Sequence, residues 1–366
     1  MRLLIDAHLD LAWNALSWKR DLRLPIGDIN GRERDMTDRK GRGRATVSLP
    51  ELRRGGVTIC FATLLARVSK TAKPALHGET LDYPSQDIAY AVAQGQLAYY
   101  RQLAEMGEVR VLTNRADFDE HWRQWNEAND EQRESLPVGI VVAMEGCDPI
   151  VRPEQAQQWH ADGLRFPALV HYGISAYATG TGEEGPLTDR GRRLLQEFER
   201  HGFVLDMTHL SDTSFFEALD TFGGTVIASH QNCRALVPGQ RQFSDEQIRR
   251  VVERDGVLGT AYDAWMLYPG WVRGATYAEI TSRDVVQVSA AADHIDHICQ
   301  ITGNSRHVAI GSDLDGGFGT EQTPTGLDTI ADLQKMESIL AGRGYADEDL
   351  DAVFHGNWLR VLRSCL

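Results

Sequence analysis

The sequence predicts an α/β fold, a (β/α)8 TIM-like barrel that forms one domain over residues 1–366. Two observations predict it. Short apolar runs rich in Val, Ile and Leu recur eight times, and most are separated by segments with helical patterning. Strands that are apolar along their length are typical of parallel sheets covered on both faces, and their alternation with helices indicates βαβ units. A length of 366 residues suits one such barrel with insertions.

The helices between the expected strands have recognisable ends. Thr188 or Asp189 begins a helix at residues 190–201, and Gly202 ends it. Ser244 begins another with a capping-box pattern. Eight strands joined in this way favour a closed barrel over an open doubly wound sheet. The strands are expected at residues 3–8, 57–65, 138–145, 164–171, 203–209, 226–230, 256–262 and 307–313.

The segment 66–137 is too long for one crossover between the second and third strands. Helical patterns at residues 87–106 and 115–127 predict that it is a helical insertion. No linker rich in Pro, Gly or Ser and no internal repeat interrupts the sequence, so we expect a single domain with one insertion.

The chain is acidic, with 38 Lys and Arg against 52 Asp and Glu and a net charge of −14. This balance disfavours non-specific binding of nucleic acid, because phosphates need a positive footprint. Residues 32–44 form a basic-leaning run mixed with Asp and Glu, which we interpret as a solvated loop rather than a binding patch.

The five cysteines are scattered and form no Cys-x-x-Cys, so neither a disulfide framework nor a cysteine zinc site is expected. The first strand begins at Leu3, which leaves no room for a signal peptide. No apolar run reaches the roughly 18 residues of a membrane span. We therefore expect a cytoplasmic protein without membrane contact.

Several chemically active side chains fall at the carboxyl ends of the expected strands, where barrel enzymes place their chemistry. His8 and Asp10 end the first strand, and residues two apart in an extended chain share a face, so both can reach one ion. Two polar residues facing solvent are the alternative. Glu145 ends the third strand after four apolar residues, where a buried carboxylate is costly unless it is paired or metal-bound. A salt bridge at the rim is the alternative there.

His209 and His230 end the fifth and sixth strands. Alone, such a histidine is more often structural, but the tips of neighbouring strands lie about 4.8 Å apart and can share a metal. Asp313 ends the eighth strand, where it either exchanges a proton with a metal-bound water or caps the Gly-rich turn that follows. His294 and His297 lie in a helix before that strand, and we interpret them as structural or surface residues.

Five of eight strands with His, Asp or Glu at the same end are hard to explain by structure alone. His and carboxylate ligands without cysteine suit Zn²⁺. Three histidines and two carboxylates exceed what one tetrahedral zinc with a water needs, and they fit two zinc ions bridged by a carboxylate and a hydroxide. Glu145 is the expected bridge, because no lysine that could be carboxylated lies in an expected strand. The lysines are Lys19, Lys40, Lys70, Lys73 and Lys335.

Motifs follow one another along the chain: DAHLD at residues 6–10, VSLPEL at 47–52 with GGV at 55–57, MEG at 144–146, DMTH at 206–209, SH at 229–230 and IGSDLDG at 310–316. As an ordered set, from residue 6 to about residue 363, they resemble the renal (membrane) dipeptidase family of the amidohydrolase superfamily. The resemblance implies that His8 and Asp10 hold one zinc ion, that His209 and His230 hold the other, and that Glu145 bridges them.

The resemblance also implies roles outside the metal ligands. Asp313 matches the acid–base carboxylate, and His171 matches a histidine that contacts the substrate and stabilises the tetrahedral intermediate. Arg241 matches the arginine that grips the terminal carboxylate of the substrate, a role that suits a planar guanidinium. Arg234 and Arg249 compete with Arg241 for this assignment.

The expected function is therefore that of a zinc-dependent dipeptidase acting on small dipeptides, with L-Xaa-D-Xaa substrates as a lead from the family. One alternative is an amidohydrolase acting on another small amide such as an N-acyl amino acid. The other is a barrel that binds metal and a ligand without catalysis. The resemblance also implies a homodimer.

Overall fold

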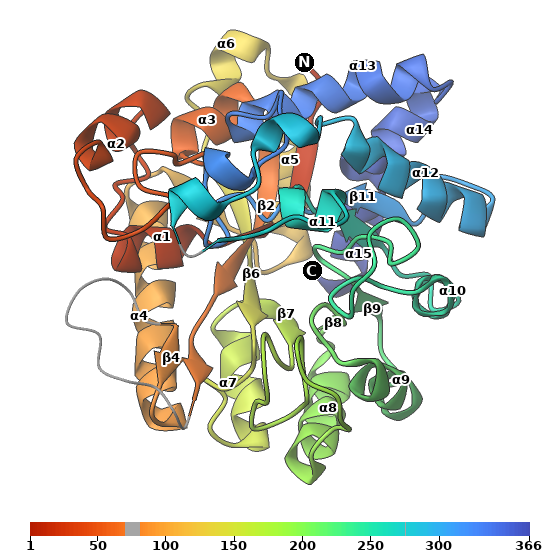
Figure 1. The fold of residues 1–366 in the computed structure, drawn as a ribbon. Helices are drawn as coiled ribbons and strands as arrows, with labels where there is room; N and C mark the ends of the chain where they lie inside the picture. Colours follow the sequence, from red (N-terminus) through yellow and green to blue (C-terminus); the bar gives the residue numbers. More distant parts are fainter. Residues whose placement is uncertain (70–80, 275) are drawn as a thin grey trace.

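The computed structural model describes residues 1–69, 81–274 and 276–366. Lys70 and Lys73 lie outside these ranges. Strands occupy the centre of the molecule and helices surround them (Figure 1). The strands are β1 Leu4–Leu9, β2 Val57–Leu64, β3 Arg67–Val68, β4 Asp82–Tyr83, β5 Val109–Val111, β6 Val138–Glu145, β7 Leu164–Ala168, β8 Leu205–Asp206, β9 Val226–Ile227, β10 Leu258–Thr260 and β11 Val308–Ile310. The α-helices are α1 Leu11–Ser17, α2 Ile26–Glu33, α3 Leu49–Arg54, α4 Gln86–Glu105, α5 Arg115–Glu127, α6 Asp130–Arg133, α7 Ala156–Ala161, α8 Asp189–His201, α9 Asp212–Thr221, α10 Asp245–Val252, α11 Ala264–Leu267, α12 Ala290–Thr302, α13 Lys335–Gly342, α14 Asp347–Asp351 and α15 Asn357–Cys365.

The main sheet is parallel. Its order is β1-β2-β6-β7-β8-β9, with β5 beside the first residues of β6. β10 and β11 form a further parallel pair, which a bridge between Ala228 and Leu258 links to the end of β9. Beyond β11, the Ser312 amide donates to Asp6 Oδ1 of β1 at 2.8 Å. The strands thus follow one another in the expected order, which confirms the parallel α/β fold. That the strands form a completely closed barrel stays a prediction.

The first four expected strands are long and the last four are short. β1, β2, β6 and β7 begin within one residue of their expected starts, whereas β8 to β11 keep two or three residues each. Gly259 and Gly311 lie so close to the Ser229 carbonyl that a Cβ at either would collide with its oxygen. Asp206 Oδ1 accepts from the amides of Thr208 and Ser229, both at 3.0 Å. In this half of the sheet, some backbone amides therefore donate to a side chain instead of to a carbonyl of the neighbouring strand.

The expected helix ends are confirmed. Thr188 Oγ1 accepts from the Gly191 amide at 3.0 Å at the start of α8, and Gly202 ends that helix in the left-handed conformation with φ 73°. Ser244 and Gln247 form the capping box of α10. These local signals were readable because each is satisfied within a few residues.

The segment 66–137 contains both expected helices, as α4 and α5. Its residues 70–80 lie outside the described ranges. The described part also contributes β5 to the main sheet and holds the short pair β3–β4, so the segment is not helical throughout. That it is an insertion within one domain stays a prediction.

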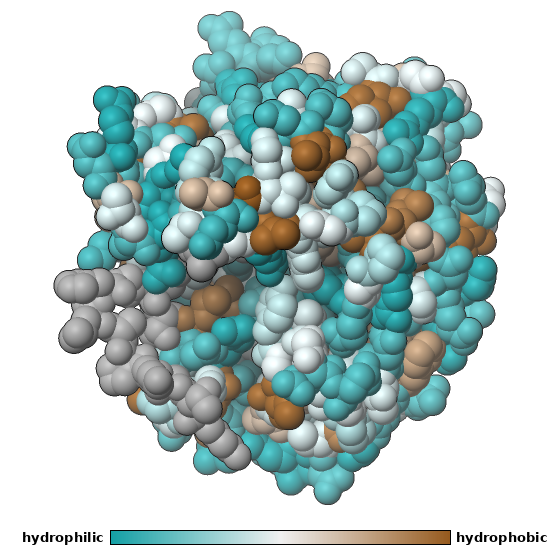
Figure 2. Space-filling model, viewed as in Figure 1, coloured by the Kyte–Doolittle hydropathy of each residue, from teal (hydrophilic) through white to brown (hydrophobic). Residues whose placement is uncertain are grey.

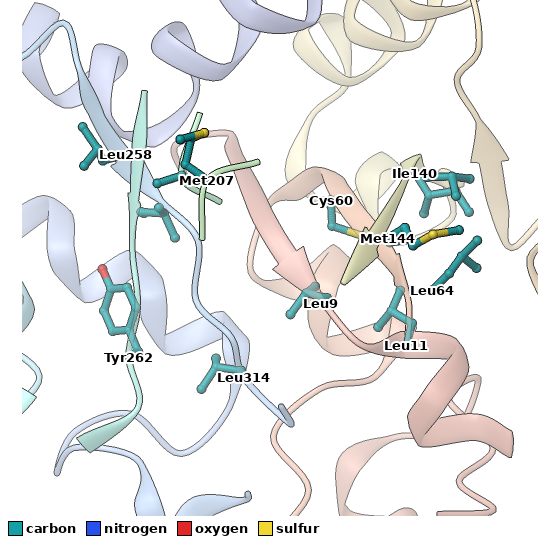
Figure 3. Packing of buried hydrophobic residues seen from close by; sticks show 14 of the residues in the cluster. Leu9, Leu11, Cys60, Leu64, Ile140, Met144, Met207, Leu258, Tyr262 and Leu314 are labelled. Atoms are coloured by element: carbon teal, nitrogen blue, oxygen red, sulfur yellow. The ribbon is translucent and has the colours of Figure 1, made fainter. Parts of the chain in front are cut away.

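Apolar side chains cover both faces of the strands. On one face, residues such as Cys60 and Ile140 join the larger core cluster, part of which Figure 3 shows. On the other face, Phe61 and Phe166 stack with ring centroids 4.1 Å apart, and Trp358 of α15 meets Phe61 edge-on at 5.2 Å. This double burial explains why the strands are apolar along their whole length.

The face of the molecule shown in Figure 2 is mostly hydrophilic, with small separate hydrophobic patches. The five cysteines are free; Cys60, Cys147 and Cys233 are buried, and Cys299 and Cys365 are partly buried. Among the residues described, no helix combines the length and apolarity needed to cross a membrane.

Candidate metal centre

A cavity of about 330 Å³ lies at the carboxyl ends of the strands. His8 and His230 lie buried beside it, with Nε2 atoms 3.7 and 3.4 Å from Glu145 Oε1. The structure therefore brings the predicted site residues together from positions about 300 residues apart. Those that line the cavity itself are Asp10, Glu145, His171, His209, Arg241 and Asp313.

His209, His230 and Glu145 form a compact triangle of possible ligand atoms. The two Nε2 atoms are 3.2 Å apart, and they lie 3.1 and 3.4 Å from Glu145 Oε1. Two atoms bound about 2.0–2.1 Å from a tetrahedral zinc ion are themselves about 3.3 Å apart. The triangle has the dimensions of three ligands of one zinc ion.

His8, Asp10 and Asp313 form a second group around the same Glu145. His8 Nε2 lies 3.9 Å from Asp10 Oδ1, 3.9 Å from Asp313 Oδ1 and 3.7 Å from Glu145 Oε1. His8 Nε2 and Asp10 Oδ1 are buried and make no hydrogen bond. Such atoms are costly to leave unpaired, and a cation between them would satisfy both. Because Glu145 reaches both groups, it could serve two ions.

The Nδ1 atoms of His209 and His230, which face away from Glu145, each form a hydrogen bond with a hydroxyl group. Nδ1 of His209 lies 2.8 Å from Thr181 Oγ1, and Nδ1 of His230 lies 2.9 Å from Ser229 Oγ. Each hydroxyl can fix the ring and leave Nε2 facing Glu145. A second contact of this kind orients metal-binding histidines in general.

The electrostatics of the cluster also fit a cation. Burial raises the pKa of the Glu145 carboxyl well above its ordinary value, and the charge of Asp313 adds to this. Burial likewise raises the pKa of Asp10 and Asp313 well above the ordinary range. Burial, with the charge of Arg241, lowers the pKa of His8 to about 3. Divalent cations among these groups would favour the ionised carboxylates and neutral imidazoles that metal binding needs.

Local backbone geometry holds the strand ends in place. His209 and Asp313 adopt the left-handed conformation, with φ 70° and 59°. Residues with side chains rarely adopt it, and such conformations gather at functional sites. Asp6 Oδ1 accepts from the amides of both His8 and Ser312, at 3.1 and 2.8 Å. One carboxylate thus fixes the ends of β1 and β11 relative to each other.

His171 lies on the open side of the cluster, with Nε2 3.7 Å from Glu145 Oε1. Its Nδ1 is 3.2 Å from NH1 of Arg67. Because a guanidinium only donates, Nδ1 must accept, and the proton of the neutral ring sits on Nε2. His171 therefore presents a donor to the cavity, unlike an imidazole whose Nε2 binds a metal.

Of the three arginines that compete for a substrate carboxylate, Arg241 alone lines the cavity. Its guanidinium donates to Gln231 Oε1 at 2.6 Å and to the His230 carbonyl at 3.0 Å. Arg234 instead forms an ion pair with Asp212 at 2.7 Å, and Arg249 is exposed on α10. The geometry favours Arg241.

Three further basic residues line the cavity that sequence reasoning missed: Lys40, Arg67 and Arg273. Lys40 lies in the run 32–44, whose interpretation as a solvated loop was wrong in part. Glu33 and Arg42 are 5% and 6% exposed, and Arg42 NH1 lies 2.8 Å from Glu33 Oε1. No motif in the sequence marked these positions.

The two helix histidines are structural, as expected. His294 is buried and its Nδ1 accepts from the Cys233 amide at 3.0 Å. His297 Nε2 lies 2.8 Å from Asp245 Oδ1 of α10.

The model of the membrane dipeptidase family, peptidase family M19, matches residues 2–365. The chain belongs to this family. Curated relatives include dipeptidase aclJ of Aspergillus oryzae, 29% identical over 230 residues that cover 62% of this chain and 51% of the relative. An uncharacterised Klebsiella pneumoniae protein encoded 5′ of pqqA is 28% identical over 280 residues, 74% of this chain and 94% of that protein. The chain spans about half the length of the dipeptidases that it matches first.

Solved structures of a dipeptidase of family M19 and of a metallopeptidase share the fold. The dipeptidase AC superposes with a TM-score of 0.76 at 21% identity and covers 100% of this chain and 98% of its own. A metallopeptidase from Rhodobacter sphaeroides, bound to a phosphinate mimic of the dipeptide L-Ala-D-Ala, superposes with a TM-score of 0.75 at 22% identity. It covers 100% of this chain and 99% of its own. The M19 fold therefore extends over the whole chain.

Proposed function

We propose that this M19 protein is a zinc-dependent dipeptidase with a binuclear site, which hydrolyses short substrates with a free carboxyl terminus, L-Xaa-D-Xaa dipeptides among them. The observation that supports this most is the position of Glu145 Oε1, within 3.1–3.7 Å of four imidazole Nε2 atoms. Similarity to a metallopeptidase that binds a dipeptide mimic supports the substrate class.

In this proposal His8 and Asp10 hold one zinc ion, His209 and His230 hold the other, and Glu145 bridges the two. The donor set suits zinc, because it combines imidazole nitrogens and carboxylate oxygens without cysteine. When bound, such a pair supplies a nucleophilic water at neutral pH and a Lewis acid for the scissile carbonyl.

The residues around the ligands would orient the substrate and move protons. Arg241 binds the terminal carboxylate, and its hydrogen bonds to two neutral acceptors leave its charge available. His171 donates a hydrogen bond from its Nε2–H to the carbonyl oxygen as negative charge develops there. Asp313 accepts a proton from the attacking water and returns it to the departing amine.

Replacement of Asp313 by Asn tests the proposal. The amide keeps the shape of the side chain but cannot accept the proton, so we expect Asp313→Asn to lower kcat by about 10²–10⁴-fold while zinc content is kept. Zinc per chain by plasma mass spectrometry and amine release from dipeptides are the measurements. Asp189→Asn is the control, because the Asp189 side chain at the start of α8 is fully exposed. A near-normal rate in Asp313→Asn would remove that carboxylate from the mechanism.

The same assay separates the alternatives when L,L and L,D dipeptides are compared with N-acyl amino acids that share the C-terminal residue. Faster turnover of the N-acyl compounds would favour an amidohydrolase of another class. Stoichiometric metal without turnover of any compound would favour a binding protein. The homodimer and the cytoplasmic location stay predictions from the sequence.

A further inference from the structure

The cavity carries more positive charge than one terminal carboxylate requires. Among the residues that the structure describes, four basic side chains line it. Two already have carboxylate partners, since Arg67 Nε lies 2.9 Å from Asp82 Oδ1 and Arg273 NH2 lies 2.8 Å from Asp263 Oδ2. The remaining two are Arg241, whose proposed partner is the terminal carboxylate of the substrate, and Lys40.

Lys40 is half-buried, and its Nζ donates to the Arg273 carbonyl at 2.8 Å. Within residues 1–69, 81–274 and 276–366, no carboxylate forms an ion pair with it. Glu321 and Asp263 are near enough to act on Lys40 electrostatically. Both oxygens of Glu321 accept from the Gly319 amide at 3.1 Å and Glu321 lines a separate cavity, whereas Asp263 pairs with Arg273. An ammonium has three donors, so Lys40 has donors left for an occupant of the central cavity.

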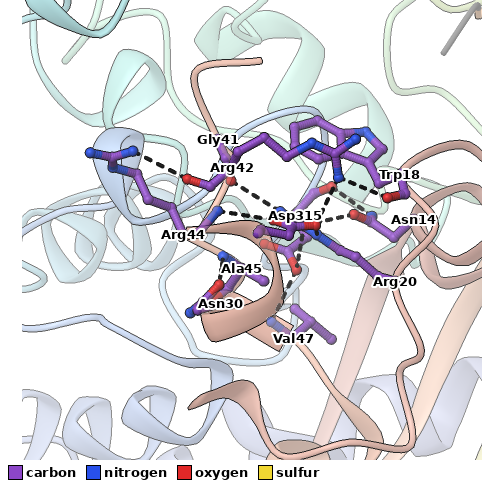
Figure 4. Close-up of polar contacts among 12 residues, drawn as sticks. Asn14, Trp18, Arg20, Asn30, Gly41, Arg42, Arg44, Ala45, Val47 and Asp315 are labelled. Atoms are coloured by element: carbon purple, nitrogen blue, oxygen red, sulfur yellow. Dashed lines mark hydrogen bonds and ion pairs between the residues drawn. The ribbon is translucent and has the colours of Figure 1, made fainter. Parts of the chain in front are cut away.

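Hydrogen bonds to the residues that follow Lys40 hold the backbone near it in place. The next residue, Gly41, accepts at its carbonyl from Arg20 NH2 at 3.0 Å, and Arg42 NH1 donates to the Trp18 carbonyl at 2.7 Å (Figure 4). Arg20, Arg42 and Trp18 are buried, so the backbone that carries the Lys40 side chain is held in place by buried contacts. A preorganised charge loses little entropy when it binds a partner.

We propose that Lys40 binds a second carboxylate of the substrate, so that the preferred dipeptides carry an acidic side chain, Asp or Glu. The inference rests on the proposed dipeptidase function and adds a substrate class to it. The carboxylates that share the cavity, Asp10, Glu145 and Asp313, surround the metal site, whereas Lys40 forms no ion pair with any carboxylate of the described residues. A charge-assisted hydrogen bond in a partly dehydrated cavity is among the stronger polar contacts.

The test compares acidic dipeptides with their neutral amides. Purified zinc-loaded protein is assayed with L-Ala-D-Glu against L-Ala-D-Gln, and with L-Glu-D-Ala against L-Gln-D-Ala, together with the four L,L forms. We expect kcat/KM for the acid to exceed that for the amide by about tenfold in at least one pair. Lys40→Met should bring this ratio to about one, Lys40→Arg should keep most of it, and Lys40→Glu should invert it.

Each ratio is taken within one protein, so a general effect of a substitution on activity cancels. Lys335→Met, which removes the same charge at a half-exposed position on α13, should keep the wild-type ratio. A wild-type ratio of one or less in every pair would overturn the proposal. An acid preference that survives in Lys40→Met would also overturn it.

Failure of the dipeptidase function would give a different result, namely no hydrolysis of any dipeptide by the wild-type protein. In that case the same acid and amide dipeptides are titrated calorimetrically into zinc-loaded protein. A tenfold tighter dissociation constant for the acid that disappears in Lys40→Met supports the second carboxylate site. Equal constants for acid and amide in the wild type refute it.

Discussion

Arg67 NH1 lies 3.2 Å from Nδ1 of His171, and this contact joins β3 to the loop after β7. The same guanidinium holds Asp82 of β4 through Nε at 2.9 Å. By donating to Nδ1, Arg67 keeps the proton of the neutral His171 ring on Nε2, which faces the cavity. We regard Arg67 as a positioning residue.

Arg67→Met should lower kcat for dipeptides by about 10–100-fold, the usual cost of losing a residue that orients an active-site group. Arg67→Lys should restore part of the rate, because an ammonium can also donate to Nδ1. Zinc content should not change. The matched control is Arg101→Met, since Arg101 forms a surface ion pair with Asp162. An unchanged kcat in Arg67→Met would contradict the role.

Zinc content should follow the ligand geometry. His230→Ala should reduce bound zinc from two ions per chain to one or fewer, because it removes a corner of the triangle with His209 and Glu145. Thr181→Val, which removes the hydroxyl beside His209 Nδ1, should weaken zinc binding about 10–100-fold. Plasma mass spectrometry after dialysis against zinc buffers measures both effects. Two ions retained in His230→Ala would show that the ligands are assigned wrongly, and His297→Ala serves as the control.

Asp315 supports the loop that carries Asp313. Its carboxylate accepts from the amides of Thr46 and Val47 at 2.9 and 3.1 Å and lies 3.4 Å from Arg20 NH1, all in buried surroundings. Asp315→Asn keeps a residue that tolerates φ 61° but removes the charge. We expect the free energy of unfolding to fall by about 2–4 kcal/mol.

Urea unfolding of Asp315→Asn at neutral pH measures this loss. The exposed Asp189→Asn should change the unfolding free energy by less than about 0.5 kcal/mol. Equal stability of Asp315→Asn and the wild type would mean that the buried pair with Arg20 contributes nothing net.

The pH dependence of stability should include a contribution from His294. Burial, with the charge of His297, lowers the pKa of His294 to about 4 in the folded protein, against about 6.5 in the unfolded chain. The unfolded state therefore takes up a proton first as the pH falls. The stability from neutral His294 is complete above about pH 6.5 and is lost, at about 1.4 kcal/mol per pH unit, as the pH falls toward 4.

His294→Gln should show a smaller loss of unfolding free energy than the wild type between pH 6.5 and 5, by about 1.1 kcal/mol per pH unit on average, because the unfolded histidine is only half protonated at pH 6.5. Urea unfolding across this range gives the two slopes, and contributions of other groups cancel in their difference. Gln300→Ala, at an exposed position of the same helix, is the control. Identical slopes for His294→Gln and the wild type would rule out a neutral, buried His294.

The sequence by itself determined the parallel α/β fold and the residues that meet at its centre. The apolar strands follow from burial on both faces, and the helix ends at Thr188, Gly202 and Ser244 follow from hydrogen bonds closed within a few residues. His8, Glu145 and His230 could be placed together because the carboxyl ends of parallel strands meet at one end of a sheet.

Tertiary structure alone decided what surrounds that centre. Lys40 and Arg67 reach the cavity from segments without a recognisable motif, and Asp315 meets Thr46 across 269 positions. Gly259 and Gly311 approach the Ser229 carbonyl so closely that a Cβ fits at neither position, and only the folded chain brings these three residues together. Local patterning records which face of an element is buried, but a contact between distant charged side chains depends on the closing of the whole chain and leaves no local pattern to read.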